Sequence, residues 1–187
     1  MTIYLVRHAY ADWNPEENRP LSARGRADAV RVADILEAFP ITAIYSSPSC
    51  RACQTVAPLA ARLGLSVHET ADLWERRLCD QPVADFFAAV RATWIDPSFA
   101  FPGGESNMAA KQRGVAFLQR LMQRYPEAHL VMATHGNLLA LLLQHFDSSI
   151  GFGFWQSLTM PDVYQLTVKL DGKGTIQRLW KPFTTST

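Results

Sequence analysis

The sequence has no excess of charge of either sign. Its 187 residues include 18 Lys and Arg against 17 Asp and Glu, which gives a formal net charge of +1. A protein that binds nucleic acid through the phosphate backbone needs a basic excess to neutralise that backbone. The charge balance therefore argues against nucleic acid as a partner.

Long apolar runs are missing as well. The first apolar stretch, residues 3–6, stops at Arg7 and follows no basic leader, so it does not have the form of a secretory signal peptide. The most apolar segment, residues 138–143, is much shorter than the roughly 20 residues that a membrane-spanning helix requires. We therefore expect a protein that has no membrane partner.

Only three cysteines are present, Cys50, Cys53 and Cys79. An odd number cannot pair completely within one chain, which favours the reducing cytoplasm as the location. Cys50 and Cys53 form a Cys-x-x-Cys pattern at a predicted helix start, as in dithiol oxidoreductases of the thioredoxin type. That alternative is disfavoured because no thioredoxin-like half precedes the pattern. A zinc site is not expected either, since no second cysteine pair exists.

The sequence does contain a regular alternation of strand patterns and helix patterns. We predict strands at residues 3–6, 43–46, 65–68, 129–134, 163–170 and 175–180. We predict helices at residues 22–39, 49–63, 82–94, 106–125 and 138–146, with loops at 73–80 and 96–104. This order predicts an α/β fold, a three-layer α/β/α sandwich with a mostly parallel central sheet. The length suits one domain over residues 1–187.

Basic side chains follow the ends of three of these strands. Arg7 and His8 come directly after the first strand, and His135 and Gly136 come directly after the fourth. Arg51 lies near the start of the helix that follows the second strand. Parallel strands deliver the residues at their carboxyl ends to one edge of the sheet, so we expect these side chains to converge. Two arginines and two histidines at one edge predict a site for a phosphoryl group.

These residue types suit phosphoryl transfer through a protein nucleophile. His8 is the candidate nucleophile, and the neighbouring cations Arg7 and Arg51 favour its neutral form because they repel an imidazolium. Arginine is always charged, and its planar fork matches pairs of phosphate oxygens. His135 is placed to donate to the same phosphate, and Gly136 lets the backbone approach closely.

Short motifs recur in order along the chain: Arg7-His8-Ala9, Asn14, Leu21-Ser22 with Gly25, Ser46-Ser47-Pro48 with Arg51 and Gln54-Thr55, Leu73-x-Glu75, residues 102–106, and His135-Gly136-Asn137. Through these motifs the chain resembles the histidine phosphatase superfamily, the phosphoglycerate-mutase-like group, along nearly its whole length, with Ala9 in place of the usual Gly. Each short motif alone is weak evidence for the family, whereas the occurrence of all of them in the family's order is strong evidence.

The resemblance implies a phosphohistidine mechanism that uses no metal and no cofactor. It implies three catalytic residues, His8, Glu75 and His135, and the phosphate-binding residues Arg7, Asn14, Arg51, His135 and Gly136. In this scheme His8 is the nucleophile and Glu75 is the proton donor. The nearby acids Glu69, Asp72 and Asp80 are the alternatives to Glu75. Residues 15–20 and 76–80 depart from the family pattern, and both segments shape the substrate pocket.

The sequence therefore predicts a phosphatase that hydrolyses phosphate monoesters of small metabolites. Phosphoglycerate mutase-type transfer and hydrolysis of protein phosphohistidine remain alternatives with the same fold, and a phosphate-binding module without turnover is a third. We expect the pocket to be lined by Tyr10, Trp13, Trp74, Arg76 and Arg77. Their aromatic rings and cations suit an anionic or ringed leaving group. Neither the substrate nor an oligomeric state follows from the sequence.

Overall fold

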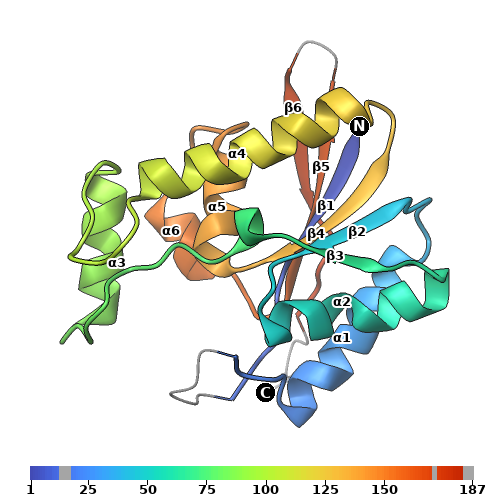
Figure 1. Ribbon diagram of the computed structural model, residues 1–187, viewed down its shortest axis with the longest axis horizontal. Coiled ribbons are helices and arrows are strands. Elements are labelled where there is room, and N and C mark those ends of the chain that lie inside the picture. Colours follow the sequence, from blue (N-terminus) through green and yellow to red (C-terminus); the bar gives the residue numbers. More distant parts are fainter. Residues whose placement is uncertain (13–17, 170–171, 183–187) are drawn as a thin grey trace.

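The computed structural model of the chain describes residues 1–12, 18–169 and 172–182. Its centre is a six-stranded sheet in the order β3-β2-β4-β1-β5-β6 (Figure 1). The strands are β1 (Thr2–Arg7), β2 (Ala43–Ser46), β3 (Val67–Glu69), β4 (His129–Thr134), β5 (Asp162–Val168) and β6 (Gly174–Arg178). The first four run parallel, whereas β5 pairs antiparallel with β1, and β6 pairs antiparallel with β5. The predicted mostly parallel sheet is confirmed.

Helices cover both faces of the sheet, as Figure 1 shows. One face carries α1 (Ala23–Leu36) and α2 (Cys50–Leu63), and the other carries α4 (Asn107–Arg124) and α5 (Gly136–Gln144). Alternate residues of β1 point to the two layers, because successive side chains of a strand face opposite ways. Ile3 and Leu5 pack in the cluster of α4 and α5, and Tyr4 and Val6 pack in the cluster of α1 and α2. The three-layer sandwich is therefore confirmed.

Strand pairing aligns three strand ends at one edge of the sheet. Arg7 of β1 lies opposite Thr134 of β4, and Ser46 of β2 lies opposite Ala133 of β4. The residue that follows each strand end therefore leaves the sheet at the same edge. These three residues are His8, Ser47 and His135.

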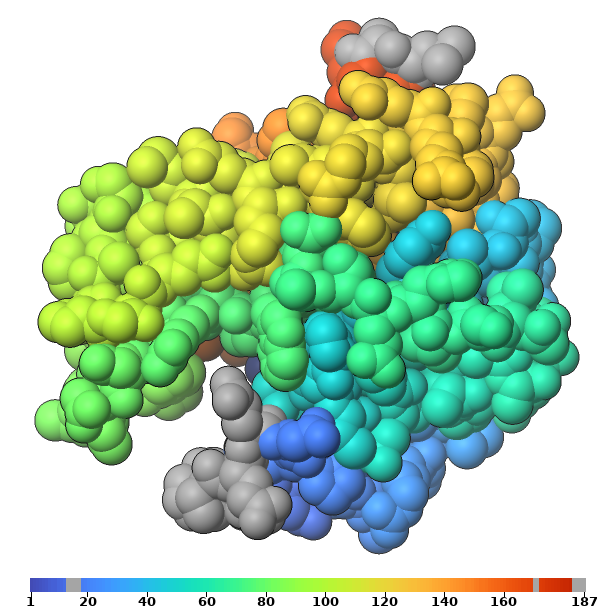
Figure 2. Space-filling model, viewed as in Figure 1, coloured from blue at the N-terminus to red at the C-terminus, as the bar shows by residue number. Residues whose placement is uncertain are grey.

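Most predicted elements are present with shifted ends. The strand predicted at residues 65–68 is β3, and the helix predicted at residues 82–94 is α3 (Phe86–Ile95). α3 begins late because the Asp85 side chain accepts a hydrogen bond from the Ala88 N–H over 2.9 Å and caps the helix there. Figure 2 shows α3 standing out from the body of the molecule at one end of α4. Its Phe86 and Phe87 rings are accordingly exposed.

Two short elements were not predicted, and α5 begins earlier than predicted. The structure adds a single 3₁₀ turn, η1 (Ala71–Leu73), and a short helix, α6 (Phe152–Ser157). α5 begins at Gly136 rather than at residue 138, and its residues 136–143 are all buried, as its apolar pattern predicts. In the ranges that the structure describes, no helix combines the length and the apolar character needed to span a membrane.

Candidate active site

His8 lies in a buried position at the end of β1. Its Nδ1 is 2.8 Å from the carbonyl oxygen of Ala9. A carbonyl oxygen can only accept, so Nδ1 carries the proton and donates it to that hydrogen bond. Nε2 therefore presents a lone pair, which accepts a hydrogen bond from Nε of Arg51 over 3.2 Å. This tautomer makes Nε2 the nitrogen that is able to attack phosphorus.

Arg51, in the first turn of α2, connects the two histidines. Besides its contact with His8, its Nη2 lies 3.2 Å from Nδ1 of His135. An arginine can only donate, so Nδ1 of His135 accepts, and its Nε2 carries the proton. That Nε2 donates to Oγ of Ser47 over 2.9 Å. The rings of His8 and His135 meet edge to face with their centroids 5.1 Å apart.

Burial and positive charge keep both histidines neutral. The pKa of His8 is lowered from 6.5 to about 3, chiefly by desolvation and further by the cations of Arg51, Arg7 and Arg19. The hydrogen bond to Ala9 acts in the opposite direction, because it favours the protonated form. Desolvation also lowers the pKa of His135 well below 6.5. A neutral imidazole at His8 is the form that a nucleophile needs.

Arg7 is held between a loop and a helix start. Its Nη1 donates to the carbonyl oxygen of Leu158 over 2.9 Å, and more weakly to that of Thr159 over 3.4 Å. The guanidinium lies against Gly136, where the Cβ of an alanine would come within 3.0 Å of both Cζ and Nε of Arg7. Gly136 was predicted to permit a close approach, and the group that approaches it is Arg7. We refer to Arg7, Arg51 and His135, the three side chains predicted to bind phosphate, as the phosphate clamp.

Glu75 lies beside this clamp and is bound to the start of α5. Its Oε2 accepts a hydrogen bond from the N–H of Asn137 over 2.9 Å, and its Oε1 accepts one from the N–H of Leu138 over 3.0 Å. The carboxylate therefore caps the helix, whose first amide groups and dipole favour an anion. This contact explains the early start of α5. The charge of Glu75 also stabilises the protonated form of Arg7 and so raises its pKa, which burial lowers.

The structure brings most of the predicted site residues together. His8, Arg7, Arg51, His135 and Gly136 meet at the carboxyl edge of the sheet, and Glu75 lies next to them. Of the predicted lining residues, Trp74 stacks on the ring of His135 with an interplanar angle of 10° and a centroid distance of 6.2 Å. Asn14 and Trp13 lie outside the described residues.

The sequence indicated no individual role for three residues near His8 and His135. Ser47, which holds His135, belongs to a motif that was recognised without a role for each residue. Its place directly after a strand that pairs with β4 is the signal that could have identified it. Arg19 acts electrostatically on His8 from the loop before α1, where no pattern indicates it. Thr55 belongs to the motif that contains Arg51. Its Oγ1 accepts a hydrogen bond from the N–H of Ala9 over 2.9 Å and so fixes the turn after His8.

Metal ligands are not clustered in the part of the chain that the structure describes. No group of three His, Cys, Asp or Glu side chains there could hold a metal ion. Metal independence therefore stays a prediction that needs an activity measurement. Cys50, Cys53 and Cys79 are free thiols.

Comparison with known proteins identifies the family. Residues 3–181 match the sequence profile of the histidine phosphatase superfamily, branch 1. The chain therefore belongs to the histidine phosphatase superfamily, and the resemblance read from its motifs is confirmed.

The similar proteins with assigned activities include phosphatases. A glucosyl-3-phosphoglycerate phosphatase of Mycobacterium tuberculosis is 30% identical over 161 residues, which cover 75% of this chain and 72% of that protein. Phosphoserine phosphatase 1 of Hydrogenobacter thermophilus is 27% identical over 148 residues, which cover 71% of this chain and 70% of that protein. The solved structure of a mycobacterial glucosyl-3-phosphoglycerate phosphatase has a TM-score of 0.79 at 25% identity, with 95% of this chain and 97% of that chain covered.

Proposed function

We propose that this protein hydrolyses phosphate monoesters of small metabolites and that His8 accepts the phosphoryl group. The observation that carries the proposal is the double contact of Arg51 with Nε2 of His8 and Nδ1 of His135. Phosphate oxygens are stronger partners for a guanidinium than imidazole nitrogens are. An arriving phosphate therefore draws the N–H groups of Arg51 onto its oxygens and uncovers the lone pair of His8.

The reaction then runs in two displacements at phosphorus. Nε2 of His8 attacks, and the N–P bond forms while the P–O bond to the leaving group breaks with its electron pair. The phosphate clamp holds the negative charge on the three remaining oxygens. The family resemblance adds Asn14, which lies outside the described residues, as an expected phosphate ligand. Water then attacks the phosphorus, the P–N bond breaks, and neutral His8 and inorganic phosphate are released.

Glu75 is the proposed source of the proton for the leaving oxygen. An alkoxide is too basic to leave readily without a proton, so an acid has to lie beside it. The contacts to α5 fix the carboxyl group next to the clamp. They favour its anionic form, so the proton has to be taken up when the phosphate dianion binds, on the lone pair of Oε2 that the Asn137 amide leaves free. In the second displacement the same group takes the proton from the attacking water.

The substrate proposed here carries a second anionic group. Arg76 is 4% exposed, and its Nε and Nη1 have no hydrogen-bond partner among the described residues. The carboxylates of Glu75 and Glu105 lie near enough to favour its charged form, but neither forms a hydrogen bond with the guanidinium among the described residues. Glu75 is bound to α5, and Glu105 is paired with Arg113 over 2.7 Å. A buried guanidinium with unpaired N–H groups favours an anion that can satisfy them. Phosphoserine and glucosyl-3-phosphoglycerate, after which two relatives are named, both contain a carboxylate.

The test compares esters that differ only in that group. 3-Phosphoglycerate and glycerol 3-phosphate share the phosphate ester, but only the first has a carboxylate. With a chelator present in both assays, we expect inorganic phosphate to be released faster from 3-phosphoglycerate than from glycerol 3-phosphate. We expect Arg76→Met to remove this preference. Loss of all hydrolysis in the chelator, restored by a divalent ion, would overturn the metal-independent mechanism. Transfer to a second acceptor without phosphate release would favour the mutase alternative.

The free thiols support the expectation of a cytoplasmic protein.

The comparison of substrates also includes a phosphohistidine-containing protein, because a protein phosphohistidine phosphatase would use the same nucleophile. Hydrolysis of that protein in preference to every small ester would contradict the proposed substrate class.

A further inference from the structure

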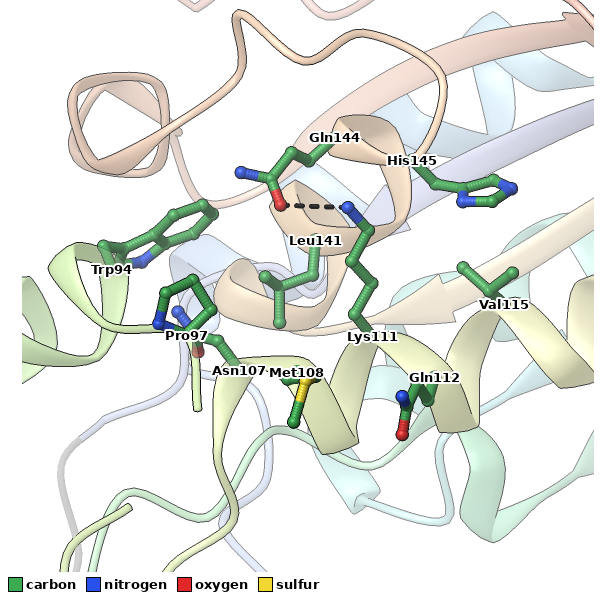
Figure 3. A pocket seen from close by; sticks show the side chains of 10 residues that line it. All are labelled: Trp94, Pro97, Asn107, Met108, Lys111, Gln112, Val115, Leu141, Gln144 and His145. Atoms are coloured by element: carbon green, nitrogen blue, oxygen red, sulfur yellow. Dashed lines mark hydrogen bonds between the residues drawn. The ribbon is translucent and has the colours of Figure 1, made fainter. Parts of the chain in front are cut away.

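A pocket of about 380 Å³ lies between α4, α5 and the end of α3 (Figure 3). Its apolar walls are formed by Trp94, Pro97, Met108, Val115 and Leu141. No residue of the phosphate clamp lines it. Its volume falls within the range of about 300–1,000 Å³ that is usual for pockets that hold small organic ligands.

One cation reaches into this apolar space. Figure 3 shows the Lys111 side chain crossing from α4 to α5, where its Nζ donates to Oε1 of Gln144 over 3.1 Å. No Asp or Glu lines the pocket, and no ion pair in the described ranges includes Lys111. Lys111 is partly buried, and this burial lowers the pKa of its ammonium group. An ammonium has three N–H groups, so Lys111 can donate to an anion and keep its bond to Gln144.

The walls are held in place before any ligand arrives. The indole Nε1 of Trp94 donates to Oδ1 of Asn137 over 3.1 Å, and Nδ2 of Asn137 donates to Oδ1 of Asn107 over 2.9 Å. On the opposite side, Nε2 of Gln144 donates to the carbonyl oxygen of Ile150 over 2.9 Å. Fixed walls reduce the conformational entropy that a ligand has to overcome on binding.

We propose that this pocket binds a small amphipathic carboxylic acid, separately from the phosphorylated substrate. The carboxylate bonds to Nζ of Lys111, and an aryl or short alkyl body packs on Trp94, Met108 and Leu141. A single lysine matches the one charge of a carboxylate. The pocket also has polar lining residues, but the amide groups of Asn107 and Gln144 already donate to the carbonyl oxygens of Thr93 and Ile150. Gln112 and His145 are neutral, so no second cation balances a phosphate dianion, whose desolvation is costly.

The probe is 4-phenylbutyrate, titrated into the full chain by calorimetry and by NMR. The neutral analogue 4-phenylbutanol keeps the ring and the linker but lacks the carboxylate. We expect saturable binding of the acid, with an affinity about tenfold or more above that of the alcohol, as for a hydrogen bond to a charged group. Excess inorganic phosphate should not compete. The indole N–H resonance of Trp94, assigned with Trp94→Phe, should shift on binding.

The variant Lys111→Met keeps the length and apolar stem of the side chain and removes the charge. We expect it to lose the preference for the acid while it still binds the alcohol. The matched control Lys181→Met, at an exposed position outside the pocket, should bind like the parent protein. The proposal is overturned if the acid does not saturate, if acid and alcohol bind equally, if phosphate displaces the acid, or if the Trp94 resonance stays fixed. The shift of the Trp94 resonance is measured in the parent protein, so it tests the proposal even if Lys111→Met folds poorly.

Discussion

Nε of Arg51 donates to Nε2 of His8 over 3.2 Å, so the residue proposed to bind phosphate covers the lone pair of the proposed nucleophile. The same guanidinium reaches His135, whose orientation depends in turn on Ser47. A change at any member of this chain of hydrogen bonds should therefore act on catalysis rather than on the fold.

Ser47→Ala should lower kcat without unfolding the protein. The substitution removes the acceptor of the His135 Nε2–H, so that ring is no longer held in one tautomer and orientation. We expect a loss of about tenfold, near the lower end of the scale for groups that orient a catalytic residue. The control is Ser49→Ala in the same turn, because the buried Ser49 hydroxyl has no hydrogen-bond partner among the described residues. Equal kinetics of the two variants would contradict the role of Ser47.

Gly136→Ala should displace Arg7. The new Cβ would lie 3.0 Å from Cζ of Arg7, so the guanidinium has to move by a few tenths of an ångström. We expect kcat/KM to fall on the order of tenfold, since small misplacements of positioning groups are costly in catalysis. Gly153→Ala is the matched control, because its Cβ would have no neighbour within 4 Å. Steady-state kinetics of both variants decide the matter, and unchanged activity of Gly136→Ala would show that Arg7 is not constrained there.

Stability should fall as the pH decreases below about 6.5. The unfolded chain protonates its histidines near that pH, whereas the folded pKa of His8 is about 3 and that of His135 is also lowered. Their contribution to stability is therefore complete above pH 6.5 and is lost toward pH 3. Each group adds a slope of up to about 1.4 kcal/mol per pH unit. Urea unfolding between pH 7 and 5.5 measures this slope, which His8→Asn should reduce. An unchanged slope in that variant would argue that His8 titrates normally in the folded protein.

Glu75→Gln should discriminate between leaving groups. Glycerol phosphates release a basic alkoxide that needs a proton, whereas nitrophenolate leaves without one. We expect a large loss of kcat on the alkyl esters and a small loss on nitrophenyl phosphate. Loss of the charge that caps α5 should also reduce the free energy of unfolding by about 1 kcal/mol. The control Glu69→Gln, at an exposed end of β3, should change neither quantity. Equal losses on both ester types would mean that Glu75 positions the site, and Asp72 and Asp80 would be tested next.

The edge at which the site forms could be predicted because the signal is local. The apolar runs of β1 and β4 end abruptly in Arg7 and in His135, and parallel pairing brings such ends together. The three layers of the fold could be predicted from the alternation of strand and helix patterns along the chain. What could not be predicted is how the side chains pair across the fold. Ser47 and His135 are 88 residues apart, and no pattern in either segment encodes their hydrogen bond.

The ends of helices were predicted less well for a related reason. The N-terminus of α5 depends on Glu75, which comes from a different part of the chain, so the sequence of the helix itself does not reveal its start. Apolar residues also do not show whether a partner exists to cover them. Phe86 and Phe87 fit a helical pattern, yet α3 stands at the end of the molecule and leaves both rings exposed.

The most direct test is the chemical identity of the residue that carries phosphate during turnover. The protein is mixed with a labelled phosphate ester and quenched within milliseconds at alkaline pH, where a P–N bond survives. The tautomer fixed by Ala9 predicts label on Nε2 of His8, lost rapidly in acid and absent from His8→Asn. Acid-stable label on a serine, or label on any peptide that lacks His8, would contradict the mechanism.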